Sequence, residues 1–321
     1  MDIHALKKGC DRVLFYTKNF ARYFMPNCLY IPYNTDNLTE EELDVVNRRV
    51  SYYLRIPKDS HVNVSSATQV KDFKYPFGQK KKYATYFFDL HPFVRKMPPE
   101  AYFHYTFGDV NWQTANPAFV KARPVCEGET NNVICKLNQV RHFRFISDAI
   151  PFCDKKDQLI FRNIVHNQPN RTLFIKMFSS SPMCNVGQIN NDVDGTNPEW
   201  IKPFVPIAKQ LEYKFIACLE GHDVATNLKW VMSSNSIAVM PRPHVESWFM
   251  EGTLIPDYHY IEIKDDFSDT IEKITYYIQH PREAEQIIDN AHKYIEQFRN
   301  KRLENIIQQE VVNRYFAQTQ Q

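Results

Sequence analysis

The sequence predicts an α/β fold built on parallel strands, mainly from the alternation of two patterns in its second half. Apolar runs typical of buried strands occur at 215–219, 237–240 and 258–263, and segments of helical spacing lie between them at 224–231 and 245–250. Strands that alternate with helices favour a parallel sheet with crossover connections. The length of 321 residues and the hydrophobic fraction of 43% fit two domains better than one.

A polar turn, Glu220-Gly221-His222-Asp223, follows the first of these apolar runs and precedes a helical pattern. In parallel sheets, ligands bind outside the carboxyl ends of the strands, where turns meet helix N-termini. We therefore expect this turn to hold a phosphate-bearing ligand, with amide groups at the start of the following helix as donors.

The other elements are predicted from caps and apolar runs. Thr39, followed by three glutamates, predicts the start of a helix over 39–55. Residues 86–90 and 102–107 are predicted to form strands. The last sixty residues have helical patterns, with Asp269 and Glu272 spaced as in a capping box and Pro281 in the first turn of a helix.

The pattern of strands restarts near Ile150-Pro151, where a charged stretch precedes a new apolar run. We therefore predict an N-terminal domain over residues 1–150, which begins with a basic helix. A C-terminal domain over 151–321 is expected to include the C-terminal helices.

Composition excludes several classes of protein. The 39 Lys and Arg against 37 Asp and Glu leave a net charge of +2, which gives no electrostatic case for nucleic acid as the main partner. None of the seven cysteines forms a C-x-x-C pair, so reduced thiols in the cytoplasm are favoured over a disulfide framework. No apolar run approaches the roughly 20 residues that span a bilayer, so a soluble or peripheral protein is expected. Neither G-x-G-x-x-G nor a P-loop is present.

The N-terminal stretch 5–24 combines five basic residues with aromatic ones in a helix-compatible pattern. Two interpretations remain open. Such a helix lies on an anionic membrane surface, or it packs against its own domain as an ordinary helix.

Asp109 is the candidate general base. It follows a predicted strand and Gly108, in a loop that also contains Trp112. A carboxylate there deprotonates an incoming hydroxyl if it reaches within hydrogen-bond distance. The alternative is an aspartate that only caps a turn.

A group of cations stands near predicted strand ends and helix starts, where Arg and Lys neutralise a diphosphate leaving group, or are merely solvated. In the second half these are Arg162, Arg171, Lys214 and Lys229. In the first half the candidates for lining a cleft are Lys121, Arg123, Lys136, Arg141 and His142.

Two acidic features have a functional and a structural interpretation. Glu246, in the first turn of a predicted helix, either accepts hydrogen bonds from ribose or sugar hydroxyls or simply stabilises the helix. Asp192 and Asp194 form a D-x-D pair, a pattern that holds divalent metal in many sugar-nucleotide enzymes, but they lie in a loop whose composition produces such pairs readily.

Several segments resemble glycosyltransferase family 90. The main ones are Glu220-Gly-His-Asp-Val-Ala-Thr-Asn-Leu-Lys-Trp, continuing to Ser236, then Trp248-Phe-Met-Glu-Gly252, 254–260 and Lys264-Asp-Asp-Phe-Ser-Asp269. Supporting segments are 107–110, 119–124, 136–143 and 156–162. The family includes protein O-glucosyltransferases, fungal capsule xylosyltransferases and a compact bacterial lipopolysaccharide branch, which this chain resembles most.

The resemblance implies a GT-B architecture, in which two Rossmann-like domains face each other across a cleft. It implies an inverting transfer from a UDP-sugar, without metal or other cofactor, to a lipopolysaccharide or related glycan at the inner face of the membrane. It places the base on Asp109 and donor contacts on Arg171. Further donor contacts fall on Gly221, His222, Asp223, Val224, Ala225, Thr226 and Asn227.

Two departures from the family pattern stand near the expected diphosphate. The family's Arg-Gly-Ser reads Arg162-Asn163-Ile164 here, and an arginine of the eukaryotic members aligns with Asn227. Lys229 is a candidate for replacing the lost positive charge. Two alternatives remain: a metal-dependent transferase that uses the D-x-D pair, and a non-catalytic module that binds a glycan or a nucleotide sugar.

Overall fold

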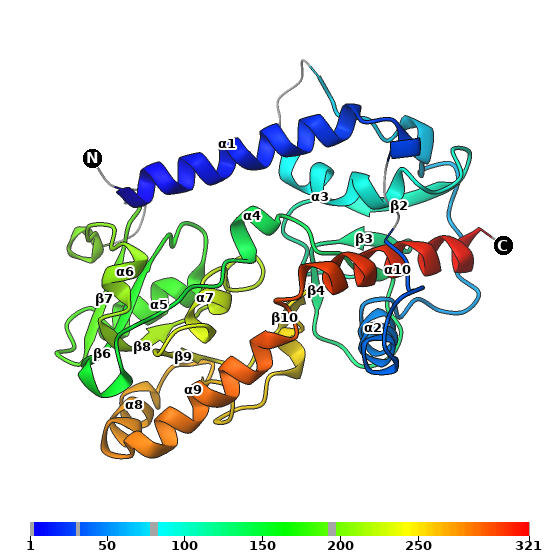
Figure 1. The fold of residues 1–321 in the computed structure, drawn as a ribbon. Coiled ribbons are helices and arrows are strands. Elements are labelled where there is room, and N and C mark those ends of the chain that lie inside the picture. The colour runs from blue at the N-terminus through cyan, green and yellow to red at the C-terminus, as the bar shows by residue number, and fades with distance from the viewer. Residues whose placement is uncertain (1–2, 30–32, 78–82, 192–196, 321) are drawn as a thin grey trace. The chain divides into compact units, whose positions relative to one another are not determined.

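The computed structural model describes residues 3–29, 33–77, 83–191 and 197–320 (Figure 1). The chain forms two compact units, and in each case the unit is assembled from separate stretches. The first contains Met1–Arg141, Val245–Phe249 and Phe298–Gln321, and the second contains His142–His244 and Met250–Gln297.

The first unit has a four-stranded sheet of order β1-β2-β3-β5, in which only β1 is antiparallel to its neighbour. The strands are β1 (Thr68–Gln69), β2 (Tyr102–Thr106), β3 (Ala118–Val120) and β5 (Asn132–Ile134). A separate antiparallel pair joins β4 (Ala122–Pro124) to β10 (Val245–Ser247). The helices are α1 (Ile3–Phe24), α2 (Glu40–Tyr53), α3 (Ala84–Val94) and α10 (Lys301–Thr319), with 3-10 turns at Asn27–Leu29 and Val70–Asp72.

Helix α2 begins where the sequence predicts it. The Thr39 side chain accepts a hydrogen bond from the Glu42 amide, and the Glu42 carboxylate accepts one from the Thr39 amide, which completes a capping box. The buried face of α2 packs on α10, where Arg49 forms a buried ion pair with Glu304. Trp248 donates to the same carboxylate at 2.7 Å and stacks on Tyr53 with ring centroids 4.1 Å apart.

Three expectations for this unit are wrong. Residues 86–90 lie inside helix α3, and all of them are buried. This segment therefore lacks the alternation of apolar and polar residues that indicates a helix in the sequence. Residues 245–247 form strand β10, because their backbone pairs with the distant strand β4. Helix α10 belongs to the first unit, whereas the sequence assigns it to the C-terminal domain.

The second unit has a five-stranded, entirely parallel sheet of order β11-β9-β8-β6-β7, which confirms the predicted α/β class. Its strands are β6 (Lys156–Asn163), β7 (Cys184–Gln188), β8 (Tyr213–Ala217), β9 (Ile237–Met240) and β11 (Ile261–Glu262). Its helices are α5 (Pro169–Phe178), α6 (Ile207–Gln210), α7 (Leu228–Met232), α8 (Thr270–Gln279) and α9 (Pro281–Glu296), and α4 (Gln139–His142) lies where the chain enters this unit. Short 3-10 turns occupy Phe152–Asp154, Pro198–Trp200 and Glu251–Thr253.

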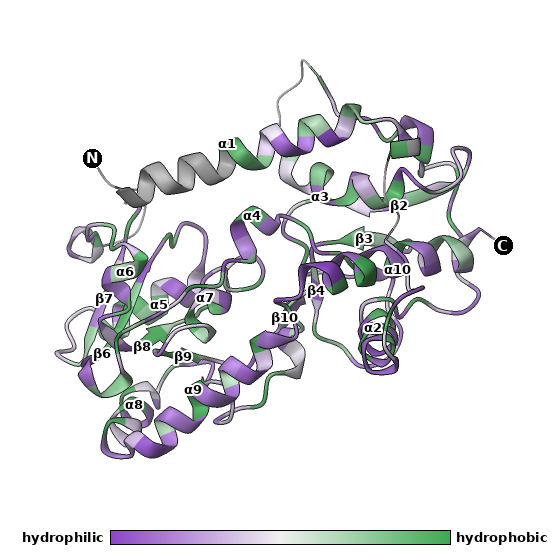
Figure 2. Cartoon of the chain, viewed as in Figure 1, coloured by the Kyte–Doolittle hydropathy of each residue, from purple (hydrophilic) through white to green (hydrophobic). Residues whose placement is uncertain are grey.

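The core of the second unit lies between this sheet and its helices. Every residue of β8 and β9 is buried, and α9 alternates hydrophobic and hydrophilic residues because only one face packs inward (Figure 2). Pro281 opens α9 as predicted. Asp269 precedes α8 but accepts from the Lys264 amide instead of capping the helix, so the expected capping box is absent there.

The strand order of the second unit reverses between β6 and β8. From β6 the chain first moves to β7 on one side and then to β8 on the other. In open parallel sheets, the loops that leave two such strands diverge and leave a crevice in which ligands bind. The carboxyl ends of β6 and β8 are therefore where a ligand site is expected, and the turn 220–223 follows β8.

Candidate active site

A pocket lies at the carboxyl ends of β8, β9 and β11. It is lined by Asn170, Cys218, Leu219, Glu220, Val224, Ala225, Leu228, Met240, Pro241, Arg242, Pro243, His244, Glu251, Asp265 and Phe267. The sequence-predicted residues Val224 and Ala225 are among them. The pocket combines apolar walls with a few convergent polar side chains, as small-molecule sites do.

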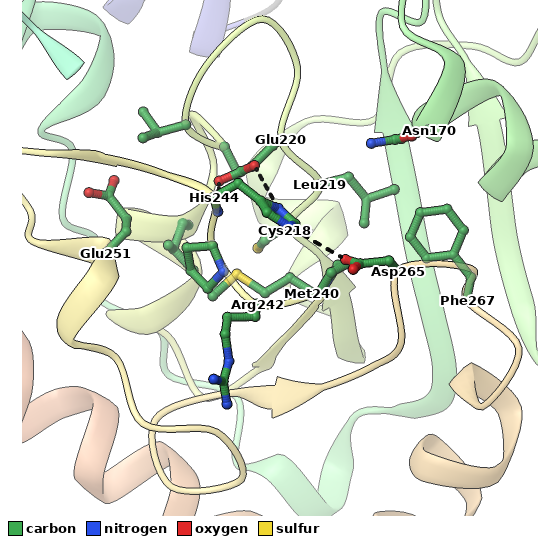
Figure 3. A pocket seen from close by; sticks show the side chains of 15 residues that line it. Asn170, Cys218, Leu219, Glu220, Met240, Arg242, His244, Glu251, Asp265 and Phe267 are labelled. Atoms are coloured by element: carbon green, nitrogen blue, oxygen red, sulfur yellow. Dashed lines mark hydrogen bonds and ion pairs between the residues drawn. The ribbon is translucent and has the colours of Figure 1, made fainter. Parts of the chain in front are cut away.

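His244 stands between two carboxylates at the rim of this pocket (Figure 3). Its Nδ1 lies 3.6 Å from Oε2 of Glu220, and its Nε2 lies 4.0 Å from Oδ1 of Asp265. The backbone amide of His244 also donates to Oε1 of Glu220 at 3.0 Å. Polar contacts among Glu220, His244 and Asp265 thereby link the loops that follow β8, β9 and β11.

Arg171, on helix α5, holds the loops that leave β6 and β8. Its Nη1 donates to the Ile164 carbonyl at 3.0 Å, its Nη2 to the Leu219 carbonyl at 2.8 Å, and its Nε to the Glu220 carbonyl at 3.1 Å. The guanidinium thus spans the point where the strand order reverses, beside the predicted turn. Arg171 therefore lies beside the predicted turn, as expected of a cation near a ligand site. Its three hydrogen bonds go to backbone carbonyls and hold the two loops in position.

Gly221 allows this close approach. A Cβ atom at this position would lie 2.9 Å from Nη2 of Arg171 and 3.0 Å from both Oε1 and Nε2 of Gln168. The Oε1 atom of Gln168 is buried and has no hydrogen-bond partner among the described residues. The turn is therefore packed tightly against Arg171 and Gln168, and it leaves a buried polar atom beside it.

The remaining residues of the turn differ in exposure. His222 is exposed, Asp223 is buried, and Thr226 and Asn227 are half-buried. Asn227 donates to the Ala217 carbonyl at 3.0 Å and so ties the turn to the end of β8. Helix α7 begins only at Leu228 and is five residues long, so the expected helix N-terminus directly after Asp223 is wrong.

Lys229 and Glu251 form a fully buried ion pair next to the pocket. Glu251 lines the pocket and Lys229 does not. Burial raises the pKa of the neighbouring Cys218 thiol, although the positive charge of Lys229 opposes this shift. Because of the ion pair, the charge of Lys229 is already balanced by Glu251.

Arg162 lies at the end of β6. Its Nη1 donates to the carbonyl oxygens of Phe161 at 2.9 Å and Asn185 at 2.7 Å, and its Nη2 donates to the side chain of Asn185. Burial lowers the pKa of this guanidinium. It does not line the pocket.

In the first unit, Asp109 follows β2 and pairs with a buried lysine. The ammonium of Lys121 lies 2.8 Å from Oδ1 of Asp109; the lysine side chain is 3% exposed and the aspartate 40%. The same ammonium lies 5.9 Å from the ring centroid of Tyr86. The predicted base and one predicted cleft cation are therefore brought together, and the carboxylate remains accessible.

Two other predicted cations of the first unit stabilise its framework. Nε of Arg123 lies 2.7 Å from Oε1 of Glu246, and both charged side chains are buried. The other carboxylate oxygen, Oε2, accepts a hydrogen bond from the Tyr52 hydroxyl. Lys136 pairs with Glu304 of α10 at 2.5 Å. Glu246 lies in the first unit and so does not join the pocket of the second.

Three predicted cleft residues stand apart from these ion pairs. Trp112 is 51% exposed, and its carbonyl accepts a hydrogen bond from Asn132 at 2.8 Å. Arg141 is exposed and His142 is buried. Asp192 and Asp194 lie outside the described residues. Among the residues that the structure describes, no group of three or more His, Cys, Asp or Glu side chains is arranged to hold a metal ion.

Three residues at the site, His244, Asp265 and Gln168, are not among those that the sequence predicts. His244 and Asp265 are polar residues in the loops that follow strands β9 and β11, and a polar loop after a strand is the same signal that identified the turn after β8. Gln168 stands in the loop after β6, and only the strand order reveals that this loop adjoins Gly221.

Comparison with known proteins assigns the chain to a family. The model of Glycosyl transferase family 90 matches residues 135–315, more than half of the chain. The chain is also 40% identical, over 238 residues, to the O-glucosyltransferase LpsA of Dichelobacter nodosus, and the match covers 74% of each protein. Both the pocket at the strand ends and the predicted turn lie within the matched region. The protein is a glycosyltransferase and belongs to glycosyltransferase family 90.

Proposed function

We propose that the protein transfers a sugar from a UDP-sugar to a hydroxyl group of a lipopolysaccharide or related glycan, with inversion at the anomeric carbon. The observation that carries this proposal is the extensive similarity to a protein described as an O-glucosyltransferase. The pocket of the second unit, at the carboxyl ends of parallel strands, supports a nucleotide-sugar site. In this proposal the two units are the two Rossmann-like domains of a GT-B enzyme.

Asp109 is the proposed general base. It accepts the proton of the acceptor hydroxyl while that oxygen forms a bond to the anomeric carbon, and the bond from that carbon to the UDP oxygen breaks. Lys121 supports this role because its buried ammonium, 2.8 Å away, fixes one carboxylate oxygen and leaves the partly exposed group in a defined orientation. The two side chains together act as one positioned base.

The proposed leaving-group site is the turn 221–227 with Arg171. Arg171 reaches the turn directly, and its positive charge stabilises the negative charge that develops on the departing diphosphate. Direct donor contacts by Arg162, Lys229 and Glu246 remain predictions. Each of these three side chains already has a protein partner, so donor contact requires it to share that partner or exchange it.

The proposed reaction needs no divalent metal, since the base and the cation that stabilises the leaving group are both side chains. A metal-dependent transferase using Asp192 and Asp194 is the alternative. Activity in the presence of a chelator, and in the double variant Asp192→Ala with Asp194→Ala, distinguishes the two. Full retention of turnover in both experiments is the expected result.

Peripheral association with the inner face of the membrane is also proposed, through α1 (blue in Figure 1). None of the described helices is long and apolar enough to cross a membrane. The outward residues of α1 from Val13 on are mostly apolar, with Leu14 69% and Phe24 68% exposed, and the segment 13–25 contains Lys18 and Arg22 but no acidic residue. Such a face binds anionic lipid through apolar burial and charge. Co-sedimentation with anionic vesicles, lost in Leu14→Ser with Phe24→Ser, is expected.

Thermal unfolding with a panel of UDP-sugars tests the donor class. A ligand that binds only the folded protein raises the melting temperature, so one UDP-sugar should do so more than UDP alone. If neither UDP nor any UDP-sugar stabilises the protein, the donor class is wrong.

Asp109→Asn tests catalysis: turnover should be lost while donor binding persists, and unchanged turnover would overturn the assignment of the base.

A further inference from the structure

The first unit contains a second hollow, apart from the pocket at the strand ends of the second unit. It is lined by Phe73, Lys74, Tyr75, Pro76, Tyr83, Ala84, Phe87, Tyr105 and Phe107. Its volume is about 390 Å³, within the range of about 300–1,000 Å³ that is usual for ligand pockets. Six of the nine lining residues are aromatic, and no carboxylate is among them.

This hollow lies next to the Asp109–Lys121 pair. Phe107, one of its walls, is separated from Asp109 only by Gly108. A Cβ atom on Gly108, whose φ is +115°, would lie 3.0 Å from the hydroxyl oxygen of Tyr83, another wall residue. The turn that presents Asp109 is therefore packed against the hollow.

The Tyr86 ring contacts both the walls of the hollow and the lysine that pairs with Asp109. It lies 5.4 Å from the Phe107 ring and 5.5 Å from the Tyr83 ring, measured between centroids. The same ring also contacts the Lys121 ammonium, which forms the ion pair with Asp109. The hollow, the lysine and the carboxylate therefore share one set of packed side chains within a single unit.

The walls suit a ligand that has both apolar faces and polar edges. Tyr83, Tyr105 and Phe107 are only partly buried, so their rings are available for contact. Three of the six aromatic walls are tyrosines, whose hydroxyls can donate or accept hydrogen bonds. Aromatic rings with polar tips combine apolar contact and hydrogen bonding in this way.

We propose that this hollow is the acceptor subsite, which holds a pyranose ring of the acceptor glycan by stacking against the aromatic walls. The hydroxyl of the neighbouring sugar unit is thereby presented to Asp109. A pyranose offers an apolar C–H face to a ring and hydroxyls to the polar tips of the tyrosine walls, whereas an acyl chain offers apolar contact alone. This inference rests on the proposed function, and it names the part of the acceptor that the enzyme recognises.

The test compares Phe107→Leu and Tyr105→Leu with wild type, using core oligosaccharide freed from the lipid part of bacterial lipopolysaccharide. Each variant should raise the KM for the oligosaccharide by about threefold to tenfold, the factor for losing one aromatic contact. The kcat and the dissociation constant of UDP should change less than about twofold. Tyr102→Leu, on the same strand but outside the hollow, is the matched control and should leave KM unchanged.

Binding of the oligosaccharide without donor, followed by saturation-transfer NMR, separates this proposal from the proposed function. Transfer of saturation in wild type that is reduced in Phe107→Leu supports the subsite even if no sugar is transferred. Unchanged KM and unchanged saturation transfer in both variants overturn the proposal, even if the enzyme is active. A rise in KM for intact lipopolysaccharide but not for the oligosaccharide overturns it too, since the hollow would then bind the lipid.

Discussion

Nη2 of Arg171 lies 2.9 Å from the position that a Cβ atom on Gly221 would occupy. The same nitrogen donates to the Leu219 carbonyl, so the guanidinium is fixed to the backbone on the N-terminal side of the glycine. Gln168 closes the remaining space at 3.0 Å. A methyl group at residue 221 therefore requires Arg171, Gln168 or the turn to shift.

Gly221→Ala should lower both the stability of the second unit and the affinity of its proposed donor site for UDP. The added methyl group forces Arg171 or the turn to move, and overpacking of this kind costs about 1–3 kcal/mol. Because the turn and Arg171 form the proposed leaving-group site, we expect the UDP dissociation constant to rise by roughly tenfold. Thermal unfolding and UDP titration measure the two effects.

Gly128→Ala is the matched control for this change. Gly128 has a φ of +76°, and no neighbouring atom lies within 4 Å of the position that a Cβ atom there would occupy, so alanine strains its backbone without displacing a neighbour. Stability should fall, but UDP affinity should stay at the wild-type value. Equal losses of UDP affinity in both variants would contradict the role given to the contact between Gly221 and Arg171.

Lys121→Met should lower turnover without affecting the donor. Methionine keeps the buried stem but removes the ammonium 2.8 Å from Asp109, so the carboxylate loses its fixed orientation. Since misplacing a catalytic group by about 1 Å costs about 100-fold, we expect kcat to fall by roughly tenfold to 100-fold. Steady-state kinetics and UDP titration should show this loss with unchanged donor affinity.

Lys71→Met provides the comparison in the same unit. Lys71 pairs with Glu100 at 2.7 Å, nearly the same separation, but both side chains are exposed. Its removal should leave kcat unchanged. If Lys121→Met also retains full turnover, Lys121 has no positioning role and Asp109 needs no partner.

Local patterns were sufficient to predict strands β8 and β9 of the second unit and the turn that follows β8. Residues 237–240 are apolar and bounded by polar residues, and they form β9 as expected. The turn 220–223 interrupts the apolar run because it leaves the sheet, and the pocket opens beside it. Signals of this kind arise within a few residues, so a single sequence contains them.

Long-range pairing could not be predicted in the same way. Glu246 follows a helical spacing, yet its backbone pairs with Arg123 in β4, and its carboxylate is buried against that guanidinium. Residues 86–90 are buried on every side in α3, and such a segment has neither helical nor strand periodicity. These outcomes depend on residues more than a hundred positions away or on complete burial, which local spacing does not encode.

Removing one partner of the Lys229–Glu251 pair should destabilise the second unit strongly. Both side chains are buried, so Lys229→Met leaves an uncompensated buried carboxylate, which costs about 3–5 kcal/mol. The double variant Lys229→Met with Glu251→Leu removes both charges and should recover most of the loss. Chemical denaturation of the two single variants and the double variant gives the coupling energy, and additive losses would show that the pair acts as two independent groups.

The first unit should lose stability as the pH rises toward neutrality, because of Asp89. Burial raises the pKa of this carboxyl from 3.8 to about 7, against hydrogen bonds from Gln139 that oppose the shift. The folded unit therefore keeps the proton over a range in which the unfolded chain releases it. The stabilising contribution of the protonated form is complete below about pH 4 and is lost as the pH rises through 7.

Asp89→Asn tests this directly, since the amide cannot ionise. From pH 5 to pH 8, the free energy of unfolding of the variant should increasingly exceed that of wild type. The difference should grow to an amount on the order of a few kcal/mol. Thermal unfolding at pH 5, 6, 7 and 8 measures the difference. Asp59→Asn removes the same charge from an exposed position and corrects for the change in net charge. If the two variants show the same dependence on pH relative to wild type, burial of Asp89 does not control the titration.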